Sequence, residues 1–215
     1  DAGNILLGRI TIDDVVDIIR EQAEHQVMGA AGLDEDVDLF APIARTARSR
    51  AIWLGINLLT AFLASWVIGN FQPVIEKVVA TAVLMPVVAS MGGIAGTQTL
   101  TIMVRALALG QVGMSNLYPL LYKELAVGLL NGLLWAFAVG LISLAVYRDP
   151  MLSIAFGAAL VLNLAAASLA GVFIPLIQKR MGIDPALAGG TILTTVTDCC
   201  GFACFLGLAT LLLMR

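Results

Sequence analysis

Long apolar stretches alternate with short polar segments along most of the chain, starting near residue 51. Each stretch holds about 18 residues or more, the length that a helix needs to cross the roughly 30 Å hydrocarbon core of a bilayer. The stretches cover residues 51–68, 78–109, 120–147, 151–177 and 186–214. This pattern predicts an all-α membrane protein with five transmembrane helices.

The segment before the first apolar stretch has a different pattern. Asn4–Thr11 is short and rich in branched apolar residues, which favours a strand. Apolar residues then recur every three or four positions, the period of one face of an amphipathic helix. They are Ile12, Val15, Val16, Ile19, Ala23 and Val27. We expect this helix to begin at Thr11, with Asp14 as its capping partner, and the glycines at 29 and 32 to end it.

The second apolar stretch carries helix-breaking residues in its interior. Pro86 lacks a backbone N–H, and glycine lowers the stability of a helix. The glycines are Gly92, Gly93 and Gly96. Irregular backbone at membrane depth is tolerated where it is buried in protein or lines a watery cavity. We therefore expect an interrupted helix in a pore wall, although the same glycines also suit close helix packing.

Polar residues at and between the later stretches predict turns and helix contacts. Arg148-Asp149-Pro150 joins the third and fourth stretches, because proline forces Asp149 out of the helical region. Gln178–Pro185 makes the corresponding connection between the fourth and fifth. Asn131 and Asn163 lie inside the third and fourth stretches, where we expect them to form hydrogen bonds between helices.

Composition narrows the class of protein. Hydrophobic residues make up 60% of the chain and charged residues 13%, far from a soluble domain. A net charge of −3 without a basic cluster argues against a nucleic-acid partner. The sequence contains no nucleophile–base pair, phosphate loop or dinucleotide fingerprint, so we expect no enzyme.

The basic residues predict an orientation in the membrane. With five spans the two termini lie on opposite sides. If the N-terminus is cytoplasmic, seven basic residues face the cytoplasm and three face outward, as the positive-inside rule favours. The seven are Arg45, Arg48, Arg50, Arg105, Lys123, Lys179 and Arg180, and the three are Lys77, Arg148 and Arg215.

Asp198 is the only acidic residue deep inside an apolar stretch. A carboxylate at the centre of a membrane helix costs about 2.5–3.5 kcal/mol on insertion scales, so its presence indicates a function. Gly190 and Thr194 precede Asp198 on the same helix face, and Thr195 lies beside that face, one residue after Thr194. These small and hydroxyl-bearing residues favour a wet passage in which Asp198 binds a cation. A hydrogen bond from Asp198 to a neighbouring helix is the alternative.

No buried Lys or Arg is available to pair with Asp198. A two-fold axis would bring a second copy of the carboxylate, and a divalent cation would relieve the repulsion between them. Mg²⁺ suits such a pair because it keeps several waters and binds through one or two carboxylates. Thiolate ligation by Cys200 and Cys204 is a weaker alternative, since one chain cannot complete a tetrahedral site.

The amphipathic helix near the N-terminus is acidic. Its carboxylates include Asp13, Asp17, Glu21 and Glu24. They are either an ordinary solvated face or a surface that senses divalent cations, because hard cations select clustered carboxylates. His25 on the same helix has no second ligand nearby and is interpreted as a surface residue.

The residues at 86–110, PVVASMGGIAGTQTLTIMVRALALG, resemble the second-span signature of the MgtE family of magnesium channels and transporters. The fifth stretch with its single Asp198 is the second match, and the resemblance covers nearly the whole chain. The family often has Asn after the paired glycines, where this chain has Ile94. Residues 1–11 resemble the end of a CBS regulatory domain, 12–50 the connecting (plug) helix with a basic juxtamembrane segment, and 51–215 the pore domain.

The resemblance implies a homodimer in a bacterial inner membrane, with a pore on the two-fold axis between the second and fifth spans. Hydrated Mg²⁺ would bind Asp198, with Thr194 and Gly190 at the preceding pore positions. The remaining implied pore-lining residues are Pro86, Gly92, Gly93, Gly96, Thr97, Thr195 and Gly201. A Mg²⁺ channel is the main hypothesis; a proton- or sodium-coupled divalent cation carrier and a non-transporting membrane scaffold are the alternatives.

Overall fold

A computed structural model of the chain describes residues 10–30, 40–113, 116–185 and 189–214. These residues form helices, and none of them lies in a strand. The strand expected over Asn4–Thr11 lies mostly outside the described residues. The helices are α1 (Ile12–Ala30), α2 (Ile43–Gly69), α3 (Gln72–Lys77), α4 (Ala80–Ala108), α5 (Leu117–Tyr147), α6 (Pro150–Arg180) and α7 (Gly189–Leu213).

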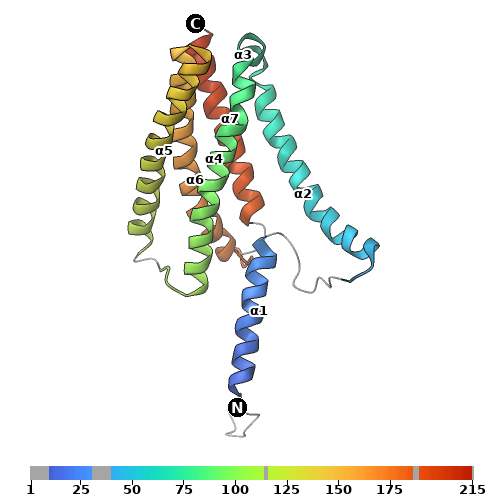
Figure 1. Ribbon diagram of the computed structural model, residues 1–215. Helices are drawn as coiled ribbons and strands as arrows, with labels where there is room; N and C mark the ends of the chain where they lie inside the picture. Colours follow the sequence, from blue (N-terminus) through green and yellow to red (C-terminus); the bar gives the residue numbers. More distant parts are fainter. Residues whose placement is uncertain (1–9, 31–39, 114–115, 186–188, 215) are drawn as a thin grey trace.

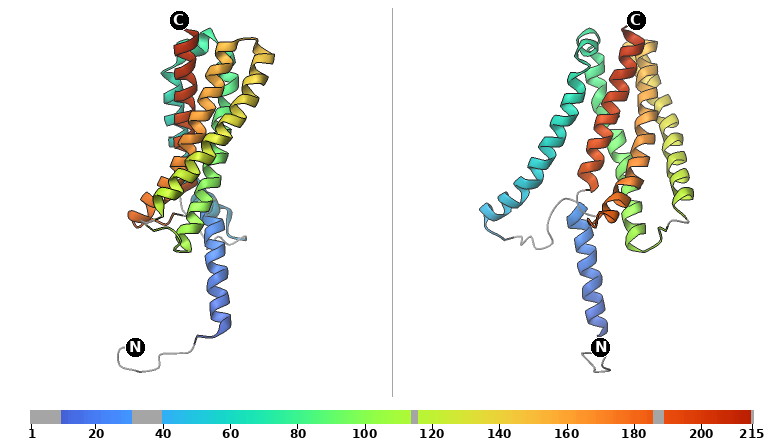
Figure 2. Two further views of the ribbon diagram at one scale, coloured as in Figure 1. Left: turned by 90° about the vertical axis from the view of Figure 1, so that its left-hand side faces the viewer. Right: turned by 180° about the vertical axis from the view of Figure 1, so that it is seen from behind.

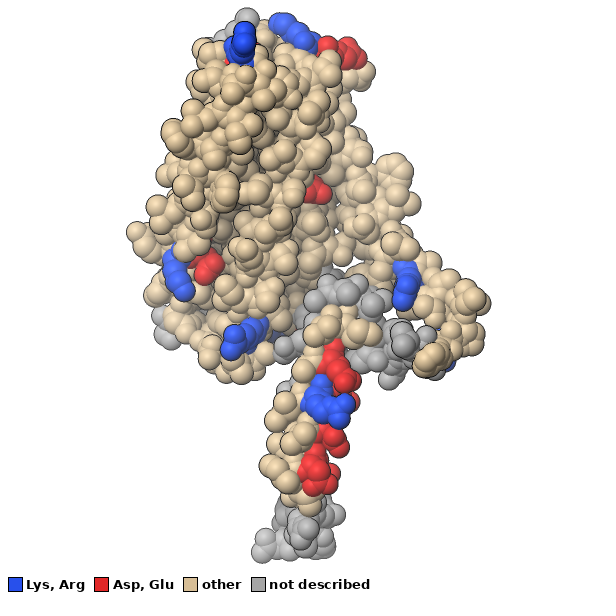
Figure 3. Space-filling view, in the orientation of Figure 1, with Lys and Arg blue, Asp and Glu red and all other residues tan. Residues whose placement is uncertain are grey.

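Five of these helices, α2 and α4–α7, are long and apolar enough to cross a membrane, so the predicted number of spans is confirmed. They form one tapering bundle, with α1 projecting from one end and the C-terminus at the other (Figure 1). Charged side chains gather at the two ends of the bundle and along α1, while the surface between them is almost uncharged (Figure 3). This distribution is typical of a multi-pass membrane protein.

The expected interruption of the second span is wrong. α4 runs without a break from Ala80 to Ala108, through Pro86 and the glycines. Pro86 lies in the second turn, so a single missing hydrogen bond near the helix end is the main loss. The rest of α4 packs against α6 and α7, and these contacts stabilise a helix that its own residues would weaken.

Two further boundaries differ from the expectation. α2 begins at Ile43, so the basic residues before residue 51 lie in its first turns and not in a separate segment. The connection after Gly69 contains the six-residue helix α3, which begins with Gln72 and Pro73. Proline is well suited to a first helical turn because its missing N–H has no helical partner there. Neither the first turns of α2 nor the short helix α3 shows the apolar periodicity by which a helix is recognised in a sequence.

The predicted turn between α5 and α6 is confirmed. Arg148 takes the left-handed conformation, with φ of 54°, and Asp149 is extended. The Asp149 carboxylate accepts hydrogen bonds from the backbone N–H groups of Met151 and Leu152, at 2.9 and 3.1 Å. This N-cap and Pro150 at the first helical position start α6 sharply after the turn.

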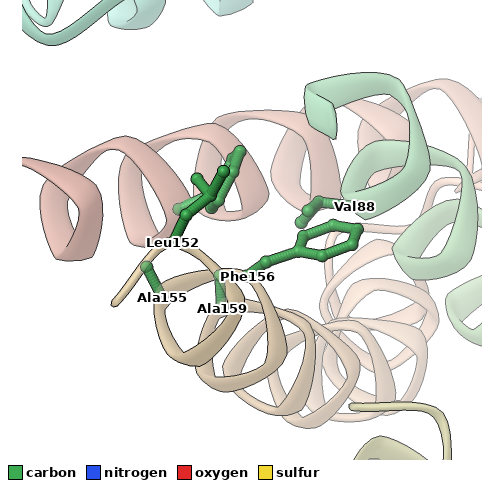
Figure 4. Close-up of a cluster of buried hydrophobic side chains, with 6 residues drawn as sticks. Val88, Leu152, Ala155, Phe156 and Ala159 are labelled. Carbon is green, nitrogen blue, oxygen red and sulfur yellow. The ribbon is translucent and has the colours of Figure 1, made fainter. Parts of the chain in front are cut away.

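α6 is the central helix of the bundle, in contact with α4, α5 and α7. Its N-terminal half forms the main apolar cluster, in which Phe156 lies against Phe205 of α7 with ring centroids 5.5 Å apart. Figure 4 shows this cluster, where α4 contributes Val88 next to the α6 residues Leu152, Ala155 and Ala159. Because α6 touches both α4 and α7, its side chains determine how those two helices lie relative to each other.

α2 is the peripheral helix. Among the described helices its extensive contact is with α7, and Ala64 is its single buried residue. The views agree that α2 diverges from the rest of the bundle toward the end where α1 lies (Figures 1 and 2). Its remaining surface, with exposed side chains such as Leu59 and Trp66, is left for lipid or for another protein chain.

Candidate cation groove

An open groove of about 450 Å³ lies between α4 and α7. It is lined by Ala89, Ser90, Gly93, Ile94, Thr97 and Gln98 of α4, and by Thr194 and Asp198 of α7. Four of the predicted site residues are therefore neighbours in the structure: Gly93, Thr97, Thr194 and Asp198. Ser90 and Gln98 also line it, although we did not single them out from the sequence.

Asp198 lies near the middle of the bundle and is partly exposed to the groove. It is the tenth residue of α7, about 14 Å from the helix start at Gly189 and about 5 Å from the helix midpoint. An acidic group at mid-height of the bundle surface is visible in Figure 3, apart from the charges at the two ends. None of the described residues forms a hydrogen bond with the Asp198 carboxylate. The alternative, in which Asp198 bonds to a neighbouring helix, therefore has no support among these residues.

The hydroxyl groups beside Asp198 are bonded to their own helices. Thr97 donates to the carbonyl of Gly93 at 2.8 Å, and Thr194 donates to the carbonyl of Gly190 at 2.6 Å. Thr195, also a predicted site residue, donates to Thr191 in the same way at 2.7 Å and is not among the groove residues. The backbone oxygen of Gly190 is thus already engaged inside α7.

The wall behind the groove is held by Asn163 of α6. Its side chain is fully buried, and Nδ2 donates to the carbonyl of Val88 on α4 at 2.8 Å. The amide fits between two glycines, because a Cβ on Gly92 would overlap Nδ2 and one on Gly201 would lie 2.7 Å from it. Asn163 therefore joins α4 and α7 from behind. Its expected inter-helix bond is confirmed, while Asn131 lies exposed on α5.

Several predicted pore-lining residues lie away from the groove. Gly92 and Gly201 are buried against Asn163, and Gly96 is buried against Leu193 of α7. Pro86 is exposed near the N-terminal end of α4. Helical geometry explains the difference, because residues next to each other in sequence are about 100° apart around the helix. Of the paired glycines, only Gly93 faces the groove.

A buried polar pair lies on the far side of α4. The hydroxyl of Thr99 donates to Oε2 of Glu124 at 3.1 Å, and both residues are buried between α4 and α5. Glu124 lies near the beginning of the apolar stretch 120–147 and next to Lys123. For this reason it does not stand out in the sequence as an isolated charge inside the membrane. The signal that could have found it is the polar Thr99 on the packed face of α4.

The described acidic, thiol and imidazole groups around Asp198, among them the adjacent Cys199, do not form a metal-binding cluster. Within the described residues no group of three or more His, Cys, Asp or Glu side chains is placed to hold a metal ion. The cysteines at 199, 200 and 204 are free and partly buried in α7. A cation in the groove would therefore meet a single carboxylate from this chain, together with hydroxyl groups and water.

The acidic residues of α1 are exposed along the projecting helix: Asp13, Asp17, Glu21 and Glu24. Asp14 caps the helix as predicted, accepting from the backbone N–H and the hydroxyl of Thr11 at 2.7 and 2.8 Å. The Thr11 backbone N–H, followed by its hydroxyl, lowers the pKa of Asp14, and the Thr11 hydroxyl also lowers that of Asp13. The first turn therefore carries two negative charges at neutral pH.

Five apolar helices with a carboxylate in a groove between two of them define a multi-pass α-helical membrane protein. The sequence model of the MgtE family, described as a divalent cation transporter, matches residues 85–208. The chain belongs to the MgtE family. The matched part includes α6 and all the groove-lining residues of α4 and α7.

Curated relatives agree with this assignment. The magnesium transporter MgtE of Thermus thermophilus is 34% identical over 212 residues, covering 97% of this chain and 46% of that protein. The magnesium transporter MgtE of Bacillus subtilis is 28% identical over 212 residues, covering 98% and 47%. The chain thus spans about half the length of the curated relatives it matches.

Proposed function

We propose that this chain forms a Mg²⁺-conducting pore with a second copy of itself, and that Asp198 binds the hydrated ion. The proposal rests on the position of Asp198. This carboxylate lies near the middle of the spanning helix α7 and lines a groove between α7 and α4. The relatives that are named magnesium transporters support Mg²⁺ as the transported ion.

The dimensions of the groove support a hydrated ion. Six waters around Mg²⁺ occupy about 180 Å³, taking about 30 Å³ for each water. The groove of about 450 Å³ exceeds this volume. Mg²⁺ releases its waters reluctantly, so a site that binds the intact hydration shell avoids a large energetic cost.

The second copy supplies what one groove lacks. The groove is open and lined by α4 and α7 alone, so a single chain would surround the ion only in part. A two-fold axis along this opening would place two Asp198 carboxylates on opposite sides of one cation. It would also cover apolar residues of α4 that are exposed in the single chain, such as Ile94 at 57% exposure.

We place the pore in the inner membrane of a bacterium, with α1 in the cytoplasm and the C-terminus outside. The described basic residues at the α1 end of the bundle outnumber those at the other end. The acidic face of α1 is then a candidate regulatory surface, where Asp13, Asp17, Glu21 and Glu24 face the cytoplasmic divalent cations.

The proposal is tested by Mg²⁺ uptake into liposomes that contain the purified chain and a Mg²⁺-sensitive dye. Asp198→Ala should reduce uptake to the level of empty liposomes, and chemical cross-linking should show unchanged dimer assembly. Glu76→Ala is the matched control, because Glu76 is an exposed carboxylate on α3. Undiminished uptake by Asp198→Ala would overturn the assignment of the ion site.

The same liposomes separate a channel from a coupled carrier. A channel gives currents that reverse at the Mg²⁺ equilibrium potential and do not change with a proton or Na⁺ gradient. A shift of the reversal potential with either gradient would show that Asp198 serves a proton- or sodium-coupled carrier. Absence of uptake under all gradients would favour a non-transporting scaffold.

A further inference from the structure

Among the described residues that line the groove with Asp198, Ile94 of α4 is the single bulky aliphatic one. The other lining residues are small, like Ala89 and Gly93, or carry a polar group. Ile94 is 57% exposed, so its own chain leaves much of this side chain uncovered. Contact with water forgoes the free energy that is gained by burying an aliphatic side chain, so its presence in the groove indicates a function.

The level of Ile94 in the groove follows from the contact beside it. A Cβ on Gly93 would lie 3.9 Å from Thr194 Cγ2, so this part of α4 lies next to Thr194 of α7. Thr194 precedes Asp198 by four residues, which is about 6 Å along the helix. α7 begins at the end of the bundle where α1 lies (Figure 1). Ile94, the residue after Gly93, therefore lies about one helical turn from Asp198, toward the α1 end.

Polar residues line the groove on both sides of Ile94 along α4. Ser90 lies one helical turn before it, and Thr97 and Gln98 lie about one turn after it. Their hydroxyl and amide groups can form hydrogen bonds with water. Ile94 is thus an apolar position between two polar parts of the same groove.

Contact with lipid does not account for this position. An isoleucine that faces acyl chains needs no explanation, because both are apolar. The groove that Ile94 lines also contains the Asp198 carboxylate, which would be costly to expose to acyl chains. We therefore expect water or a second copy of the chain opposite Ile94.

We propose that Ile94 forms a hydrophobic gate beside the Asp198 site. This inference rests on the proposed pore, in which the groove of a second copy faces this one. The two-fold axis would bring two Ile94 side chains toward each other across the passage. Apolar constrictions in channels exclude water and so hinder an ion that keeps its hydration shell. The carboxylates would bind the ion, and the isoleucines would limit its passage between Asp198 and the α1 end.

The test compares Ile94→Thr with Ile94→Val in the liposome assay for Mg²⁺ uptake. Threonine and valine are both β-branched and have almost the same shape, but only threonine has a hydroxyl that binds water. A gate that acts by excluding water predicts that Ile94→Thr raises the initial rate of uptake several-fold and that Ile94→Val raises it less. Equal rates in the two variants, raised or unchanged, would overturn the gate, because the hydroxyl would then have no effect.

Ile102→Thr is the matched control. Ile102 lies on the same helix with 53% exposure, and it is not among the residues that line the groove. This variant should take up Mg²⁺ at the rate of the parent. A rise equal to that of Ile94→Thr would show a general effect of a polar residue on α4 and would overturn the gate. Unfolding temperatures of all three variants should match the parent, so that a changed rate reports on the passage.

Failure of the gate and failure of the proposed pore give different results. If uptake by the parent does not depend on Asp198, the pore is overturned and the gate with it. If it does depend on Asp198 and Ile94→Thr behaves like the parent, the gate alone is overturned. Asp198→Ala should still abolish uptake in the Ile94→Thr background, because the carboxylate and the gate act on the same ion. Uptake by this double variant would place the faster passage outside the Asp198 site and contradict the gate.

Discussion

The two faces of α4 use similar small residues for different purposes. One face is buried against α5, α6 and α7, and includes Val88, Gly92, Gly96, Thr99 and Met103. The other face lines the groove with Asp198, and includes Ala89, Ser90, Gly93, Thr97 and Gln98. Glycine and threonine occur on both faces. The role of each residue is therefore determined by the neighbours of its side chain and not by the residue type.

The difference is sharpest at the adjacent glycines. Gly92 has no room for a side chain because Asn163 occupies the space, whereas a Cβ on Gly93 would meet only Thr194 Cγ2, at 3.9 Å. Substitutions on the buried face should thus act on stability, and those on the groove face should act on ion passage. The following predictions test this division, from the largest expected effect to the smallest.

Gly92→Ala should destabilise the protein by about 1–3 kcal/mol, as overpacking of a filled core does. The new methyl group overlaps an amide that is fully buried and bonded to Val88, so the amide must move and lose that bond. Thermal unfolding in detergent measures the effect. Gly93→Ala is the control and should be neutral or slightly stabilising. Equal unfolding temperatures for the two variants would contradict the division of the faces.

Asn163→Ala should cost about 1–3 kcal/mol, because it removes a buried hydrogen bond and leaves a small cavity. It also removes the group that excludes a side chain at Gly92. Gly92→Ala should therefore cost much less in the Asn163→Ala background, with a coupling of about 1–2 kcal/mol in a double-mutant cycle. Asn131→Ala, at the exposed asparagine on α5, should leave stability unchanged. Additive effects would show that Asn163 does not occupy the space beside Gly92.

Thr99→Val should destabilise the packing between α4 and α5 by about 1–2 kcal/mol. It removes a hydroxyl that donates to Glu124 and leaves a buried carboxylate without this donor. In the Glu124→Leu background, with no carboxylate left to satisfy, the same substitution should cost little. An undiminished cost in that background would contradict the role of the hydrogen bond. The measurement is again thermal unfolding in detergent.

Thr97→Val should have the smallest effect on stability, and its effect should appear in ion passage. The side chain faces the groove and its hydroxyl bonds only to its own helix. We expect Mg²⁺ uptake into liposomes to fall a few-fold while the free energy of unfolding stays within about 0.5 kcal/mol of that of the parent. Loss of stability comparable to that of Thr99→Val would show that the two threonines have the same role.

The sequence was sufficient for the five spans and for singling out Asp198, which lines the groove. Hydropathy identifies a membrane helix without information about its neighbours, and the cost of a carboxylate in lipid distinguishes Asp198. The cap by Asp14 and the turn at Pro150 were also predictable, because both depend on residues adjacent in the chain. These features are local, so one sequence contains all the information they need.

Features that depend on a second helix were predictable only in part, as for the bond from Asn163 to Val88. Pro86 and the glycines predicted a break in α4, but packing against α6 and α7 keeps this helix continuous. Asn131 and Asn163 have the same surroundings in the sequence, yet one is exposed and the other is buried. When a helix is apolar on all faces, the periodicity of its sequence does not show which face is buried against other helices.

The threonine hydroxyls of the groove have a consequence for the sign of the ion. Thr97 and Thr194 each give their only hydroxyl proton to a carbonyl of their own helix. Their oxygen lone pairs are what remains for the groove. Waters around a cation direct their hydrogens outward and can donate to such oxygens, whereas waters around an anion direct their hydrogens inward. These two neutral side chains would therefore favour positive ions in addition to the carboxylate of Asp198.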